Sequence, residues 1–206
     1  MNKLTTLAVL AIAVWALTTP VAFAATQSTA PITITAQVNG ALSISVNLFK
    51  NSVSVANDIP DNAINFGNLN NDLGTGNLRS TTTGSTGTGN VTALISAVSS
   101  GVQYTITQTG TQLTSGVNTI PSGATTVVPI YTPADNGGAA LVGTMGTNGS
   151  WVGTKTLYTS NAAGALRVIQ AIYSVTDDPA AGSTAVVPLS QAAGTYTGTV
   201  TFTVTA

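Results

Sequence analysis

The chain has 206 residues and little charge: five are Lys or Arg, six are Asp or Glu, and there is no histidine or cysteine. Nucleic acids and anionic lipid surfaces are bound through clusters of Lys and Arg, so we expect neither as a partner. The absence of cysteine excludes a lipoprotein anchor, a disulfide framework and a thiolate metal site, and the fold must therefore depend on its core alone.

The first 24 residues have the features of a secretory signal. Lys3 supplies a positive charge, residues 4–17 are almost uninterruptedly apolar, and Ala22-Phe23-Ala24 is a small-x-small cleavage site. The apolar run is shorter than the roughly 20 residues needed to cross a bilayer. We therefore expect a signal peptide over residues 1–24, no membrane span in the mature form, and an exported protein.

The rest of the chain is predicted to be all-β. Short runs of Val, Ile and Thr are interrupted by Gly, Asn and Pro, and this pattern is typical of many strands joined by turns. One domain is expected from a mature chain of about 180 residues. Strands are predicted over residues 32–38, 41–48, 91–98, 102–107, 125–131, 166–175, 185–189 and 196–205. Turns or loops are predicted over residues 57–62, 80–90, 133–138, 146–150 and 177–182.

Apolar residues occupy the even positions from residue 32 to residue 48, which is the alternation of a half-buried strand. Asn39-Gly40 would ordinarily predict a tight hairpin. A two-residue hairpin, however, would move the apolar face to odd positions, and the face does not change. We therefore predict an N-terminal extension over residues 25–40, a candidate donor strand, followed by a β-sandwich domain over residues 41–206. Pairing of the extension within its own chain is the alternative.

The carboxyl end has the same alternation. Tyr196, Val200, Phe202 and Val204 are apolar on even positions, and threonines fill most of the odd positions between them. An amphipathic extended segment that adds itself to a sheet edge is the physical requirement for strand donation between subunits. The two ends of the chain therefore point to a protein that packs against copies of itself.

Three segments resemble the pilins of archaic chaperone–usher fimbriae, whose subunits have the spore-coat-U-type β-sandwich. They are PITITAQV at residues 31–38, INFGNL at residues 64–69 and AGTYTGTVTFTV at residues 193–204. The cysteine that is common just after the arm in such subunits is absent here. Related filament-forming or envelope-coating β-sandwiches therefore remain open as the family.

The resemblance implies an immunoglobulin-like antiparallel β-sandwich that lacks one strand. A periplasmic chaperone and an outer-membrane usher would handle such a subunit, and a neighbour's extended N-terminal donor-type strand would complete it in an extracellular fimbria at the cell surface. On the family pattern, the donor side chains are Ile32, Ile34, Ala36 and Val38. The acceptor groove is bordered by the strand that carries Tyr196, Val200, Phe202 and Val204.

No pattern in the chain predicts an enzyme or a cofactor. Nucleophilic and general-base catalysis usually needs a group that titrates near neutrality, and histidine and cysteine are both absent. The Gly-x-Ser-x-Gly and Ser-x-x-Lys motifs are also absent. Asp177 and Asp178 precede Pro179 in a predicted turn and are not two carboxylates set across a cleft. We expect a non-enzymatic structural protein.

Two further features were weighed as binding sites. Asp135-Asn136-Gly137-Gly138 and Asp177-Asp178 offer oxygen ligands for calcium, but neither makes a spaced ligand set, and turn formation explains these residue types. Trp151 could stack on a sugar ring, which makes a secreted carbohydrate-binding module the alternative function. A tryptophan is more often a buried anchor of the core or of an interface.

Overall fold

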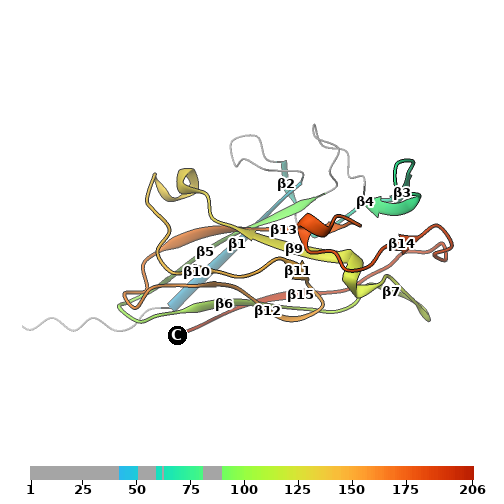
Figure 1. Cartoon of the computed structure of the whole chain (residues 1–206). Helices are drawn as coiled ribbons and strands as arrows, with labels where there is room; N and C mark the ends of the chain where they lie inside the picture. The colour runs from blue at the N-terminus through green and yellow to red at the C-terminus, as the bar shows by residue number, and fades with distance from the viewer. Residues whose placement is uncertain (1–41, 51–58, 62, 81–89) are drawn as a thin grey trace, which may run out of the picture. The chain divides into compact units, whose positions relative to one another are not determined.

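The computed structural model describes residues 42–50, 59–61, 63–80 and 90–206 (Figure 1). The predicted signal peptide, the N-terminal extension with its four donor residues, and most of the loop predicted over residues 80–90 lie outside the described residues. The described part is all-β with several antiparallel sheets, as the sequence predicts. None of its helices is long and apolar enough to cross a membrane.

The larger sheet has six strands, in the order β11, β9, β13, β5, β1 and β2, and every neighbouring pair is antiparallel. Its central strands β5 and β13 are mostly buried, since they are covered on the core side and flanked by other strands. The bounds are β1 Leu42–Lys50, β2 Ile59–Asp61, β5 Val91–Ser99, β9 Thr125–Ile130, β11 Gly149–Ser150 and β13 Arg167–Val175.

The second sheet has four strands, in the order β10, β12, β6 and β15. Its bounds are β10 Thr144–Met145, β12 Gly153–Thr159, β6 Thr105–Gly110 and β15 Val200–Thr205. Two smaller ladders complete the structure: one joins β14 (Val187–Pro188), β4 (Asn77–Ser80) and β3 (Leu69–Asp72), and the other joins β7 (Thr114–Ser115) and β8 (Asn118–Thr119). Single 3-10 turns lie at η2 (Ser122–Ala124), η3 (Pro133–Asn136) and η4 (Pro179–Ala181).

The core lies between the two larger sheets, which gives the described part a sandwich-like arrangement. Alternate side chains of each strand point inward and are fully or almost fully buried. From the larger sheet these are Val91, Ala93, Ile95, Ala97, Val127, Ile169, Ala171, Tyr173 and Val175, and from the second sheet Ile106, Gln108, Leu157 and Tyr158. The register of β12 against β6 shifts between Thr156 and Tyr158, and this bulge lets the adjacent Leu157 and Tyr158 both be buried.

Four predicted strands are confirmed with bounds close to those expected: β1, β5, β9 and β13. The strand predicted over residues 196–205 is present as β15 but begins at Val200. The strand predicted from residue 102 begins at Thr105, and the turn predicted over residues 57–62 contains the short strand β2. Strand β12 was missed, because its bulge interrupts the alternation on which the prediction depends. Strands β3 and β4 were missed because they are short and mostly polar.

Tyr104 links strand β5 to the segment before β13 at one end of the core. Its phenol donates hydrogen bonds to the carbonyl oxygens of Ala97 (2.8 Å) and Ala165 (3.0 Å), and the residue is almost fully buried. Burial, with the nearby Tyr158 as a second cause, raises the pKa of Tyr104 to about 12.

This shift predicts loss of stability in alkali. The folded-state pKa of Tyr104 lies above its ordinary value of about 10, so the contribution of the neutral phenol is fully present below pH about 10 and is lost as the pH rises towards 12. Thermal unfolding followed across this window should show a falling midpoint. A constant midpoint, with the Tyr104 phenolate forming in the folded protein, would contradict this account.

Candidate functional site

Each of the two larger sheets has an incompletely paired strand at or next to one of its edges, β15 in the second sheet and β1 in the larger one. Strand β15 pairs with β6 along its whole length, and no described strand pairs with its other edge. Strand β1 pairs with β5 throughout, but its other edge is covered by β2 only from Leu48 to Lys50. Strands β1 and β15 also contact each other, so these two edges lie side by side and leave an opening only in the sense that no described strand covers both of them.

Half-buried apolar side chains line this opening, which we call the open seam. It consists of Ile44, Val46 and Leu48 of β1 and Val200, Phe202 and Val204 of β15. All six pack against the buried core and yet remain partly accessible, whereas Ile95 and Ile169 on the central strands are fully buried. The alternation that makes β1 and β15 strands therefore leaves apolar surface uncovered by the described residues.

A row of four aromatic rings runs through the core to the open seam. The ring centroids of Phe66 and Trp151 lie 4.9 Å apart, those of Trp151 and Tyr173 lie 5.4 Å apart, and Tyr173 meets Phe202 edge-on at 6.2 Å. Such offset and edge-to-face pairs stabilise a core beyond the area that they bury. The contact with Tyr173 thus fixes the position of Phe202, and with it the core-facing side of the open seam.

A buried hydrogen-bond chain supports this row. The phenol of Tyr173 donates to the Oε1 atom of Gln108 (2.9 Å), and the Nε2 atom of Gln108 donates to the carbonyl oxygen of Trp151 (2.6 Å). Burial raises the pKa of Tyr173, so this residue remains a neutral donor at physiological pH. These hydrogen bonds fix the relative positions of β6, β13 and the segment before β12.

Of the four residues predicted to border an acceptor groove, three lie on β15 and one precedes it. Val200, Phe202 and Val204 share the seam face of β15. Tyr196 precedes the strand: its ring packs against the core, and its phenol donates to the carbonyl oxygen of Ala192 (2.7 Å). Ile44, Val46 and Leu48 were not predicted to belong to this surface, although their continued even-numbered alternation was the available signal.

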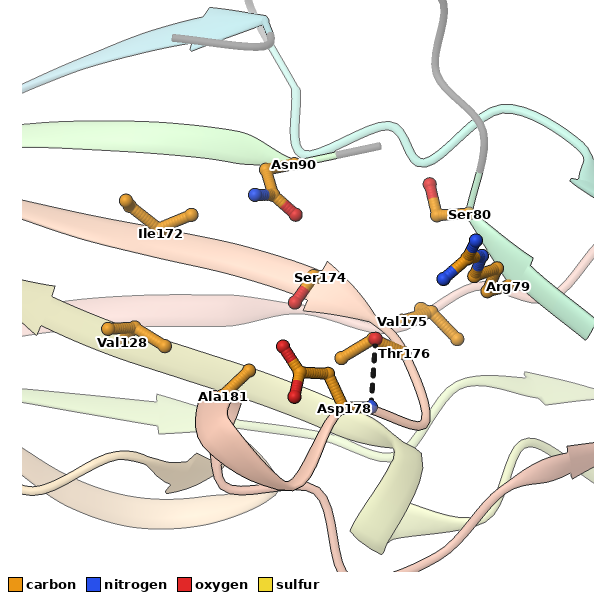
Figure 2. Close-up of a pocket in the computed structure, with 10 residues that line it drawn as sticks. All are labelled: Arg79, Ser80, Asn90, Val128, Ile172, Ser174, Val175, Thr176, Asp178 and Ala181. Carbon is orange, nitrogen blue, oxygen red and sulfur yellow. Dashed lines mark hydrogen bonds between the residues drawn. The ribbon is translucent and has the colours of Figure 1, made fainter. Parts of the chain in front are cut away.

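A second hollow, with a volume of about 420 Å³, lies between β4, β9, β13 and η4 (Figure 2). Its charged groups interact within the chain: Arg79 pairs with Asp72 at 2.9 Å, and a carboxylate oxygen of Asp178 accepts from the backbone N–H of Ala180 at 2.9 Å. The backbone N–H of Asp178 donates to the hydroxyl of Thr176 (3.1 Å), as Figure 2 shows. The charged groups of this hollow therefore have structural roles, and we assign the hollow no ligand.

The sites weighed for calcium are turns, as their residue types predict. Asp135 accepts a hydrogen bond from Gln170 (2.7 Å), and Gly137 has the left-handed φ of 62° that ends η3. Asp178 caps η4, and Asp177 accepts from the side chain of Asn77 (3.0 Å), which lowers the pKa of Asp177. No group of three or more metal-ligating side chains occurs among the described residues.

Trp151 is only 2 % exposed and belongs to the aromatic row, so its ring is not presented to a sugar. This position removes the one aromatic platform on which the carbohydrate-binding alternative depended. Comparison with protein-family models, curated proteins and solved structures finds no match to the chain. The geometry of the open seam is therefore the main guide to function.

The end of the seam at Val200 depends on a glycine. Gly110 pairs with Val200, and a Cβ atom there would lie 2.5 Å from the carbonyl oxygen of Trp151. We expect Gly110→Ala to lower the free energy of unfolding by about 1–3 kcal/mol, because backbone must shift. Denaturant unfolding measures this loss. Gly74→Ala is the control, since the nearest neighbour of a Cβ atom there is the flexible carboxylate of Asp72 at 3.5 Å. An equal loss in both variants would contradict the assignment.

Proposed function

We propose that the protein is a structural subunit of an extracellular filament, a pilus or fimbria at the cell surface. In this proposal the described part is an incomplete immunoglobulin-like sandwich, and the N-terminal extension of a neighbouring subunit completes it by donor-strand exchange. The observation that carries the proposal is the open seam: two strand edges and six half-buried apolar side chains lie together on one side of the core.

An added strand would cover both the unpaired edge and the apolar surface of the open seam. Its backbone would pair with the free edge of β15, and its alternate side chains would cover the apolar faces of β1 and β15. The extension carries Ile32, Ile34, Ala36 and Val38 at the required period of two. Burial of the larger ones contributes about 1.5–3 kcal/mol each, before the entropy of ordering the segment is subtracted.

Strand direction favours donation over pairing within the chain. Leu42 pairs with Ser99 and Thr205 pairs with Thr105, so β1 begins at the end of the sandwich where β15 finishes. An extension folded back along its own β15 would run parallel to it. An extension that enters from a neighbour at the opposite end would run antiparallel to β15. Antiparallel pairing is slightly more stable per residue and matches the rest of the sheet.

The same seam explains why an assembly partner is part of the proposal. A subunit with an uncovered strand edge and apolar surface is prone to improper association before it reaches the filament. A periplasmic chaperone would cover the seam, and an outer-membrane usher would exchange it for the next subunit's extension. The filament itself would be a homopolymer of this chain.

A matched pair of variants tests donation. Ile34→Asp should abolish filaments, because the carboxylate would have to be buried unpaired in the neighbour's seam. Thr35→Asp, on the opposite face of the same extension, should leave filaments largely intact. Electron microscopy counts the filaments, and thermal melting of isolated subunits should give the wild-type midpoint for both variants.

The same two variants distinguish donation to a neighbour from pairing within the chain. If the extension completes its own sheet, Ile34→Asp will destabilise the isolated subunit by several kcal/mol. Normal filaments from folded Ile34→Asp subunits would show that the extension is not the donor strand.

Covalent completion gives an independent test. A second copy of residues 31–38, joined after Ala206 by a short turn, would form a hairpin with β15 in the antiparallel direction. We expect a higher melting midpoint and a subunit that no longer accepts a neighbour's extension. The same fusion with Asp in place of Ile at the position copied from Ile34 should not gain stability. Equal stability of both fusions would count against the open seam as the acceptor.

A further inference from the structure

The outer face of the second sheet consists of threonines. Every outward position in its paired registers is Thr, one on β10 and three on each of the other strands. We call this the threonine face: Thr144 of β10, Thr154, Thr156 and Thr159 of β12, Thr105, Thr107 and Thr109 of β6, and Thr201, Thr203 and Thr205 of β15. None of the ten is buried.

The ladder registers align these threonines in rows across the strands. Thr154, Thr109 and Thr201 form one row, and Thr156, Thr107 and Thr203 form the next. The hydroxyls of Thr109 and Thr154 lie 3.0 Å apart, within hydrogen-bond distance. Because adjacent strands are about 4.8 Å apart and alternate residues about 6.6 Å apart, the face is a two-dimensional array of identical groups.

We propose that the threonine face is the surface by which neighbouring filaments pack side by side, with the threonine face of a second copy of this chain as its partner. The inference rests on the proposed filament and adds lateral bundling to it. It concerns the outer face of the second sheet, whereas donor-strand exchange concerns the opposite, core-facing side.

The chemistry of the face fits a copy of itself. A hydroxyl both donates and accepts hydrogen bonds, so two identical threonine arrays related by a two-fold axis can pair without any further group. The ten outward positions carry no charge, and therefore no like charges meet and no charged group is desolvated. They also carry no aromatic ring on which a sugar could stack.

The size of the face indicates that it acts only in an assembly. Four strands at about 4.8 Å spacing, with about five residues at 3.3 Å each, cover roughly 320 Å². A stable pair of proteins usually buries about 800 Å² on each partner, so isolated subunits should not dimerise through this face. Filaments repeat the face in every subunit, and the weak contacts then add through multivalency.

The proposed donor strand would enlarge the same face. If Ile32, Ile34 and Ala36 point into the open seam, Thr33 and Thr35 point to the outer side next to β15. A completed subunit would therefore present a fifth threonine-bearing strand. This continuity links the lateral surface to the polymer and not to the isolated subunit.

Charge placed at the centre of the face tests the inference. Thr107→Lys and Thr107→Glu should each give filaments of normal length that are single, with the bundled fraction reduced more than about tenfold by like-charge repulsion. Thr119→Lys is the matched control: Thr119 is exposed on β8, outside the threonine face, and its filaments should bundle as the wild type does. Electron microscopy of the whole protein gives both filament length and bundling.

Mixing the two charged variants is the decisive experiment. Preformed Thr107→Lys filaments and Thr107→Glu filaments should bundle when combined, because opposite charges meet only if the two faces meet. High salt should weaken these mixed bundles and relieve the repulsion in each variant alone. If mixed filaments remain single, or if each variant bundles by itself like the wild type, the inference is wrong.

Other results overturn it in distinguishable ways. Wild-type filaments that never bundle would refute lateral packing and leave donor-strand exchange intact, whereas a wild type that forms no filaments would refute both. Retention on crystalline cellulose or chitin that is lost in Thr107→Lys, with bundling unchanged, would assign the face to a polysaccharide. If Thr107→Lys subunits melt early, the Thr203→Lys and Thr203→Glu pair on exposed β15 replaces the Thr107 pair in the same experiment.

Discussion

The structure depends on the packing of the two larger sheets through the aromatic row. Trp151 stacks between Phe66 and Tyr173, and Tyr173 reaches across the core to Phe202 on the edge strand β15. Gln108 bonds both Tyr173 and the backbone carbonyl of Trp151, whereas the buried indole N–H of Trp151 has no hydrogen-bond partner among the described residues. Without cysteine, the chain has no covalent link to replace this contact, which positions Phe202 on β15.

This packing holds the open seam in a defined shape. An edge strand backed only by solvent would lose order, but β15 is fixed by β6 on one side and by the aromatic row below. In the proposed filament the seam would therefore be a preformed acceptor, and less conformational freedom would be lost on binding than if both partners were mobile.

The alternation of residue types along β15 and β6 produces two different surfaces. In β15 the even positions point to the seam and the odd positions to the threonine face, and β6 divides its buried and outward residues in the same way. The period of two fixes this division, since a slip by one residue would exchange the two faces. The proposed polymer contact and the proposed lateral contact thus lie on opposite sides of the same strands and can be altered separately.

The sequence by itself determined the all-β class, most of the long strands and the apolar face of β15, because alternation over six or more residues is a local signal. It also predicted the turns at residues 133–138 and 177–182 from residues that favour them. Only the tertiary structure decided that β1 and β15 border one opening, that Trp151 is buried, and that threonines from four strands form one face. These features depend on which strands pair and in what register, and on the bulge in β12. Such long-range pairing is set by packing of the whole core, which no local pattern in the chain encodes.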